Sequence, residues 1–118
     1  MNNKAVNIGE FTNQARAMAD PTRIRMLKLL EDGELCVCHI VEILGLVQST
    51  ASKHLGILKA AGLVESRKNG TWSYFRLAET ERAYNMAFLQ FLASRLDADE
   101  TVKSDRRRLG KKMMQPCK

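Results

Sequence analysis

Two cysteines one residue apart, Cys36 and Cys38, form the most reactive pattern in this chain of 118 residues. They hold two of its three thiols, and they stand just ahead of a pattern typical of a DNA-binding helix-turn-helix. Thiolates are soft ligands that select soft ions. We therefore expect Cys36 and Cys38 to bind a thiophilic ion, and we expect that binding to affect DNA affinity.

The local charge distribution favours a ligand site over the alternative of two inert buried cysteines, which is the common fate of free thiols. Residues 31–47 contain four acidic side chains and no Lys or Arg. Residues 48–76 contain five basic side chains and one Glu. The first stretch suits a cation and the second suits phosphate groups.

The spacing of the two cysteines places a condition on any shared ion. Positions two apart on an α-helix are separated by about 200° around the axis. Cys36 and Cys38 would then point to opposite sides of a helix that contained both. We expect one ion to bridge them only if the first turn unwinds or begins just after them, and that distortion is a candidate release mechanism.

Apolar periodicity and breaker residues define the elements that must position these thiols. Asp20-Pro21 is a helix start, and Gly33, Gly45 and Gly62 are expected ends. Helices are expected at residues 8–19, from Pro21 to Gly33, and at 36–44, 48–60 and 80–96.

The helix at 48–60 has the character of a recognition helix. Ala51, Leu55 and Leu58 form a buried stripe, while its first turns carry short polar side chains that can bond base edges in a groove. The alternative is an ordinary surface helix capped by Ser49, and this helix alone does not decide between the two.

A hairpin follows this helix. Asn69-Gly70 separates two β-prone runs, which predicts a two-residue type I′ turn. In that register Arg67 faces Trp72 and Lys68 faces Thr71. A basic hairpin after a groove helix is typical of a wing that contacts the DNA backbone.

The chain length predicts one domain, residues 1–97, followed by a basic tail at 98–118. The net charge of +6 lies entirely beyond residue 100. We expect this tail to be disordered and its charge to be solvated. The helix at 80–96 carries more apolar residues than one small domain can bury, which predicts a homodimer. No leader or membrane-spanning run is present, so a cytoplasmic protein with reduced thiols is expected.

Taken together, these motifs resemble the ArsR/SmtB family of winged-helix repressors over residues 8–96. The resemblance implies a mainly α winged helix-turn-helix with a small β-hairpin, homodimeric through its first and last helices. It also implies that ligand binding weakens the grip on operator DNA. The matching segments are 19–23, 34–38, 49–55, Leu58, 62–64 and 67–72.

Within the family, Leu35-Cys36-Val37-Cys38 resembles the arsenic- and antimony-responsive branch. Residues 80–96 contain no Asp, His or Cys of the kind that zinc- and nickel-type sensors use. Two positions depart from the arsenic pattern, because His39 stands in place of Asp and Val41 in place of a third Cys. Only Cys117 could replace that thiol, although an incidental tail thiol is the favoured interpretation, as a solvated side chain is for His39.

The sequence thus predicts a non-enzymatic repressor of an arsenic-resistance operon, which binds double-stranded operator DNA as a dimer. As(III) or Sb(III) is the expected inducer at Cys36 and Cys38, and DNA binding is expected to require no cofactor. His54 is expected to support the recognition helix or to meet a phosphate. The predicted DNA-binding residues are Gln48, Ser49, Thr50, Ser52, Lys53, His54, Arg67, Lys68 and Thr71.

Two alternatives remain open. A repressor of the same fold could sense oxidants, sulfide or soft metals such as Cd and Pb. A thiol enzyme such as an arsenate reductase is a remote alternative, because it needs a Gly- and Arg-rich oxyanion loop around its cysteine. Leu35, Val37 and His39 offer no such loop.

Overall fold

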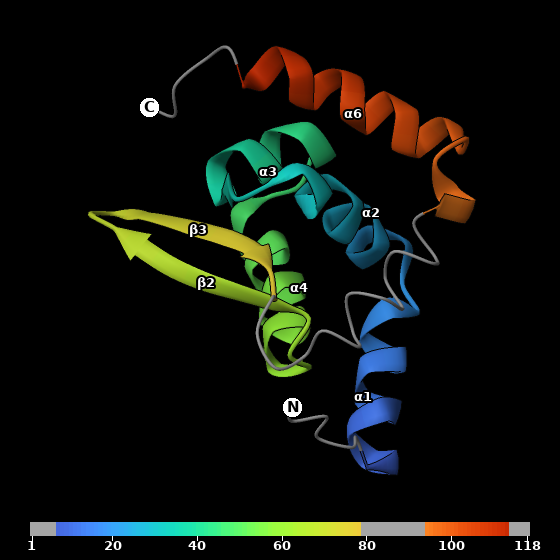
Figure 1. The fold of residues 1–118 in the computed structure, drawn as a ribbon. Coiled ribbons are helices and arrows are strands. Elements are labelled where there is room, and N and C mark those ends of the chain that lie inside the picture. The colour runs from blue at the N-terminus through green and yellow to red at the C-terminus, as the bar shows by residue number, and fades with distance from the viewer. Residues whose placement is uncertain (1–6, 79–93, 114–118) are drawn as a thin grey trace, which may run out of the picture.

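The computed structural model describes residues 7–78 and 94–113, and Figure 1 shows their arrangement. Four helices and a hairpin form the body, and a further helix lies across it. The elements in chain order are α1 (Ile8–Met18), α2 (Pro21–Leu29), the 3-10 helix η1 (Leu30–Asp32), β1 (Leu35–Cys36), α3 (Val37–Leu44), α4 (Gln48–Ala60), β2 (Val64–Asn69), β3 (Trp72–Leu77) and α6 (Glu100–Lys112).

Side-chain caps start the first two helices. Asn7 and Glu10 form a capping box at α1, each side chain binding the other residue's backbone N–H. Asp20 caps α2 by accepting a hydrogen bond from the backbone N–H of Arg23, and Pro21 occupies the first turn. The helices expected from Ile8 and from Pro21 are confirmed.

The two following helices begin differently. Cys36 is the N-cap of α3, whose end at Gly45 has the left-handed φ of 69° that favours glycine. Val47 is the N-cap of α4 and supplies no side-chain hydrogen bond. The alternative in which Ser49 caps this helix is therefore wrong, because the chain enters the helix two residues earlier.

The core is built where these helices meet. Ala51, Leu55 and Leu58 are fully buried, as the predicted stripe requires. Ile40 and Ile43 of α3 are equally inaccessible and belong to the same cluster. Packing of α3 against α4 fixes the angle at which α4 presents its other face to solvent.

The sheet contains a strand that the sequence did not reveal. β1 pairs with β3, so the strand order is β1-β3-β2, and Cys36 lies opposite Tyr74. The hairpin itself is confirmed, but its predicted register is wrong. Asn69 pairs with Trp72, Lys68 with Ser73 and Arg67 with Tyr74.

The turn is therefore Gly70-Thr71, one residue later than predicted. Gly70 has a φ of 66°, and no non-glycine residue of the described chain has a positive φ. A type I′ turn needs positive φ at both central residues, so that assignment is also wrong. Glycine at the first central position satisfies the turn while Thr71 keeps an ordinary φ.

The expected disorder of the tail is wrong for residues 100–112, which form α6. Asp99 caps this helix, and Val102 and Leu109 are buried against the body. Figure 1 shows α6 running across α2 and α3. The tail charges were expected to be solvated, whereas several of them pair with residues of α2, η1 and α3.

The pairing of Asp105 with Arg25 is the clearest case. The Arg25 guanidinium donates two hydrogen bonds of 2.9 Å to the Asp105 carboxylate, which is almost completely buried. Asp105 raises the pKa of Arg25 above its ordinary value, chiefly through this hydrogen bonding. A second group of ion pairs joins Lys28 and Glu31 to Asp97 and Arg106.

The predicted helix at 80–96 lies almost wholly outside the described residues. Within the described ranges, no helix combines the length and the hydropathy that crossing a membrane requires.

Candidate inducer site and nucleic-acid interface

Cys36 and Cys38 lie side by side at the start of α3. Their Sγ atoms are 2.8 Å apart, and the backbone N–H of Cys38 donates to the Cys36 sulfur at 3.3 Å. Cys36 has extended backbone angles of −69° and 142°, because it ends β1 and caps α3. The helix begins at Val37, between the two cysteines.

The expectation that the two side chains diverge is therefore wrong for this geometry. It applied to two positions inside one regular helix, and Cys36 stands outside it. Two thiolates bound to an ion at about 2.3 Å, as in zinc sites, lie at most about 4.6 Å apart. In the reduced protein, one soft ion can contact both sulfurs without unwinding α3, so unwinding is not a necessary step in its binding.

The surroundings of the pair supply little further ligation. Cys36 is 2% exposed, while Cys38 and His39 are half-buried. Within residues 7–78 and 94–113, no group of three His, Cys, Asp or Glu side chains could hold a metal ion. Cys117 lies outside those residues. The described part of the site is thus a pair of cysteine sulfurs, of which Cys36 is a free thiol and Cys38 takes part in a disulfide. Thiolates at these positions would select soft ions.

The recognition helix α4 presents the predicted polar residues on its free face. Gln48, Ser49, Ser52 and Lys53 are exposed, and Thr50 is half-buried. All five belong to the first two turns, the end of a recognition helix that reads base edges. Short hydroxyl and amide groups there leave the approach to a groove open.

His54 has a different position from the other predicted DNA-binding residues. It is half-buried, and Arg23 donates a hydrogen bond of 3.1 Å to its Nδ1 atom. The Asp20 carboxylate lies 4.0 Å from the same atom. Arg23 in turn donates to the carbonyl of Ala17 at 2.6 Å. His54 therefore links α4 to the start of α2 and supports the recognition helix.

The wing residues Arg67, Lys68 and Thr71 are all exposed. Arg67 is not free, because it donates hydrogen bonds of 2.9 and 2.7 Å to the Glu34 carboxylate. Its guanidinium also lies 4.7 Å from the centroid of the Tyr74 ring. Hydrogen bonding to Arg67 lowers the pKa of Glu34, and the same contact raises the pKa of Arg67.

This contact was missed in the sequence because it depends on β1. Glu34 directly precedes β1, and the pairing of β1 with β3 places it one strand away from β2, within reach of the Arg67 side chain. A two-residue strand is too short to show any alternation of apolar and polar residues. The sequence offered one signal for this contact, because Glu34 and Arg67 carry opposite charges within one small domain.

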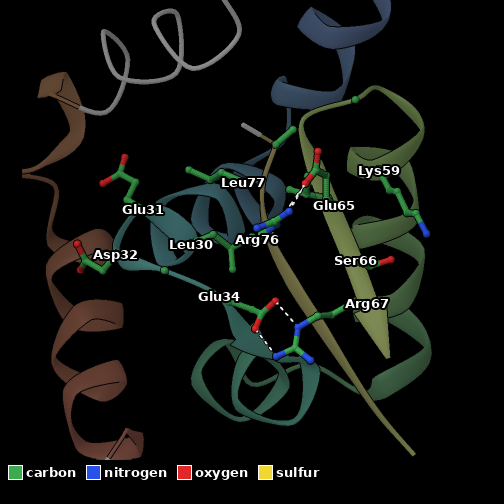
Figure 2. A pocket seen from close by; sticks show the side chains of 14 residues that line it. Leu30, Glu31, Asp32, Glu34, Lys59, Glu65, Ser66, Arg67, Arg76 and Leu77 are labelled. Atoms are coloured by element: carbon green, nitrogen blue, oxygen red, sulfur yellow. Dashed lines mark hydrogen bonds and ion pairs between the residues drawn. The ribbon is translucent and has the colours of Figure 1, made fainter. Parts of the chain in front are cut away.

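Figure 2 shows a pocket of about 1060 Å³ between η1 and the base of the hairpin. Two ion pairs line it, Glu34 with Arg67 and Glu65 with Arg76. Four carboxylates and three cationic side chains line the pocket, so its charge does not favour an anion.

A recognition helix supported from behind, followed by an exposed basic hairpin, defines the winged helix-turn-helix class of DNA-binding proteins. Comparison with known proteins agrees. Residues 20–66 match the model of the bacterial regulatory protein arsR family. An uncharacterised helix-turn-helix transcriptional regulator of Methanocaldococcus jannaschii is 49% identical over 54% of this chain and 73% of its own length.

The arsenical resistance operon repressor of Bacillus subtilis is 37% identical over 66% of this chain and 75% of its own. Among solved structures, a homodimeric winged helix-turn-helix DNA-binding domain from Mycobacterium bovis aligns with a TM-score of 0.64 and 36% identity. That alignment covers 74% of this chain and 81% of the other. The chain belongs to the ArsR family of transcriptional regulators, and the predicted fold class is confirmed. Since this is a family of DNA-binding repressors, the expectation of a non-enzymatic protein is confirmed too.

Proposed function

We propose that this repressor binds its operator as a homodimer and is released when trivalent arsenic or antimony binds Cys36 and Cys38, which derepresses an arsenic-resistance operon. The observation that carries this proposal is the 2.8 Å separation of the two sulfurs at the start of α3. The similarity to the B. subtilis arsenical repressor supports the choice of inducer.

The DNA contacts of this proposal come from two elements. Gln48, Ser49, Thr50, Ser52 and Lys53 of α4 enter the major groove, where amide and hydroxyl groups can bond base edges. Lys68 and Thr71 of the wing meet the backbone, together with Arg67 once it leaves Glu34. His54 contributes by holding α4 against α2.

The dimer of this proposal uses the exposed apolar side of α1. Ile8 is 86% exposed and Phe11 is 57% exposed, although both belong to the apolar stripe of that helix. Large apolar side chains displayed together are typical of subunit contacts. The expected contribution of the helix at 80–96 lies outside the described residues.

Communication between the two sites runs through the sheet. Cys36 pairs with Tyr74 of β3, and Tyr74 pairs with Arg67 of β2. An ion that binds the Cys36 sulfur acts on β1, which is hydrogen-bonded to strand β3 of the wing. It also acts on the start of α3, which packs directly against α4. Moving operator occupancy from 99:1 to 1:99 requires a preference of about 5.5 kcal/mol for the released state.

A gel-shift series on the protein's own promoter DNA tests this function. Reduced protein is titrated with arsenite, antimonite, cadmium and a mild oxidant. Release by arsenite or antimonite is expected. Release by oxidant or cadmium alone would overturn the metalloid assignment and favour the thiol-redox or soft-metal alternative.

The matched variants are Cys36→Ser and Cys38→Ser. Serine is a good N-cap, so Cys36→Ser keeps the cap of α3 while it removes the thiolate. Both variants are expected to bind DNA like the wild type and to ignore arsenite. If either variant is released normally, its cysteine is not an inducer ligand.

A further inference from the structure

We propose that the outward side of α6 is a third DNA-binding surface, which contacts the phosphates of operator DNA together with α4 and the wing. Arg107, Arg108 and Lys111 form this surface, the basic face of α6, and all three are exposed. The inference rests on the DNA contacts of the proposed function. It extends them to a helix that lies outside the predicted winged helix-turn-helix.

The two sides of α6 differ in what they contact. Val102, Asp105 and Leu109 are buried against the body. Because successive residues of an α-helix are about 100° apart, Arg107 and Lys111 lie on the far side of the helix, one turn apart. Within residues 7–78 and 94–113 these two cations form no ion pair. They are therefore available to an anion from outside the chain.

The inward-facing cations of α6 neutralise an acidic part of the body. Residues 31–47 contain four acidic side chains and no Lys or Arg. Arg106 pairs with Glu31 at 2.7 Å, and Lys112 pairs with Glu42 at 3.2 Å. Carboxylates left bare on this side would repel DNA phosphates. Helix α6 pairs two of them with cations and presents further cations to solvent on the same side, which suits a polyanion.

The C-terminal end of α6 lies beside the elements that carry the other DNA contacts. Lys112 pairs with Glu42 of α3, and α3 leads directly into α4. Met113 lines a pocket of about 280 Å³ together with Glu34, which also binds Arg67 of the wing. Figure 1 shows this end of α6 over α3 and the opposite end beside α2. The basic face is thus placed to meet DNA that α4 and the wing hold.

Operator DNA is the partner that these observations favour over an acidic protein. DNA held by α4 and the wing places its phosphates at high local concentration beside α6. Guanidinium groups bind phosphate oxygens with paired hydrogen bonds, and the basic face carries two of them. Such contacts add affinity and salt dependence but carry no sequence information.

The salt dependence of DNA binding tests the inference. Arg107→Gln/Lys111→Gln removes two exposed cations and leaves the buried side of α6 unchanged. The full-length double variant and the wild type are titrated with promoter DNA at several salt concentrations. The slope of log affinity against log salt should fall by about 1 for each lost contact, or up to about 2 per protomer. Affinity for an unrelated duplex should fall by a similar factor.

Lys103→Gln is the matched control. It removes the same charge from an exposed position near the other end of α6, where Lys103 pairs with Glu100 at 3.6 Å. Its slope should stay close to that of the wild type. A fall as large per charge as in Arg107→Gln/Lys111→Gln would show a general effect of net charge and would overturn the inference.

A conservative variant and an α4 variant complete the test. Arg107→Lys/Lys111→Arg keeps both charges and should keep the wild-type slope, whereas a reduced slope would overturn the assignment to phosphate contacts. If Lys53→Gln lowers the slope and Arg107→Gln/Lys111→Gln does not, α4 contacts DNA and α6 does not. That result would overturn the inference, leave the basic face to a partner such as an acidic protein, and keep the proposed function. If the wild type fails to bind promoter DNA, both are wrong.

Discussion

Arg67 of the wing donates two hydrogen bonds, of 2.9 and 2.7 Å, to Glu34, the residue that directly precedes β1. Two residues after Glu34, Cys36 pairs with Tyr74, over which the same guanidinium lies. The ion pair therefore lies between the cysteine pair and the hairpin. In the proposed function it competes with DNA phosphate for the Arg67 guanidinium.

Glu34→Gln is expected to tighten DNA binding. The substitution removes the carboxylate that competes for Arg67, so one more phosphate contact becomes available. Each added contact steepens the dependence of log affinity on log salt by about 1. Titration of promoter DNA between low and moderate salt measures that slope.

Glu65→Gln is the matched control, because Glu65 pairs with Arg76 near the base of the same hairpin. It removes the same charge but frees an arginine farther from the tip. Equal slopes for wild type and Glu34→Gln would show that Arg67 does not contact phosphate.

The same ion pair makes stability depend on pH. Arg67 lowers the pKa of Glu34 below its ordinary value of 4.5, so the folded state binds fewer protons than the unfolded state. The stabilisation is complete above about pH 4.5 and is lost as the pH falls through the lowered pKa. Both side chains are partly exposed, so solvent screens the ion pair and its contribution to stability is small.

Urea unfolding of wild type and Glu34→Gln measures this effect. The difference in unfolding free energy should be largest near neutral pH and should vanish in acid. A difference that stays constant with pH would mean that the carboxylate contributes through packing and not through its charge.

Asp105→Asn is expected to destabilise the protein by about 1–3 kcal/mol. It leaves the partly buried Arg25 guanidinium without its anionic partner, and an unpaired buried charge is costly. Chemical denaturation followed by circular dichroism measures the loss. Arg108→Gln is the control, because Arg108 contacts Asp105 from the half-exposed side and should matter little. Equal effects of the two variants would contradict this assignment.

Lys53→Gln is expected to weaken binding to all DNA sequences to a similar extent and to reduce the salt slope by about 1. Lys53 is exposed in the first half of α4, the half proposed to face the groove. Lys59→Gln makes the same change near the opposite end of the helix and should have a smaller effect. A larger loss from Lys59→Gln would reverse the orientation proposed for α4.

Val47→Ser is expected to stabilise the fold by about 1 kcal/mol. Val47 is the N-cap of α4, offers no acceptor to the helix, and is 66% exposed. A serine hydroxyl there can accept a hydrogen bond from a free backbone N–H of the first turn. Thermal unfolding checks the sign. A lower melting temperature would show that the valine side chain makes a contact of its own.

Local patterns were sufficient for much of this fold. The stripe of Ala51, Leu55 and Leu58 predicts the buried face of α4, and Asp20-Pro21 predicts the start of α2. Such features depend on residues within one or two helical turns. The exposed polar face of α4 follows from the same periodicity.

Other features required the folded chain. The pattern of the tail predicts solvated charge, and only the folded chain brings Asp105 to Arg25, eighty positions earlier. The two-residue strand at Leu35-Cys36 likewise forms only because β3 pairs with it. The position of the turn at Gly70 was also predicted wrongly. The register of the whole sheet sets that position, and the dipeptide Asn69-Gly70 alone does not.

The cysteine pair shows where the division falls. Residue types and spacing are enough to propose a thiophilic ligand, because softness is a property of sulfur itself. Whether one ion can reach both sulfurs depends on the backbone angles of Cys36, and those follow from its pairing with Tyr74. That pairing joins residues far apart in the chain, so only the packed structure brings Cys36 and Cys38 together.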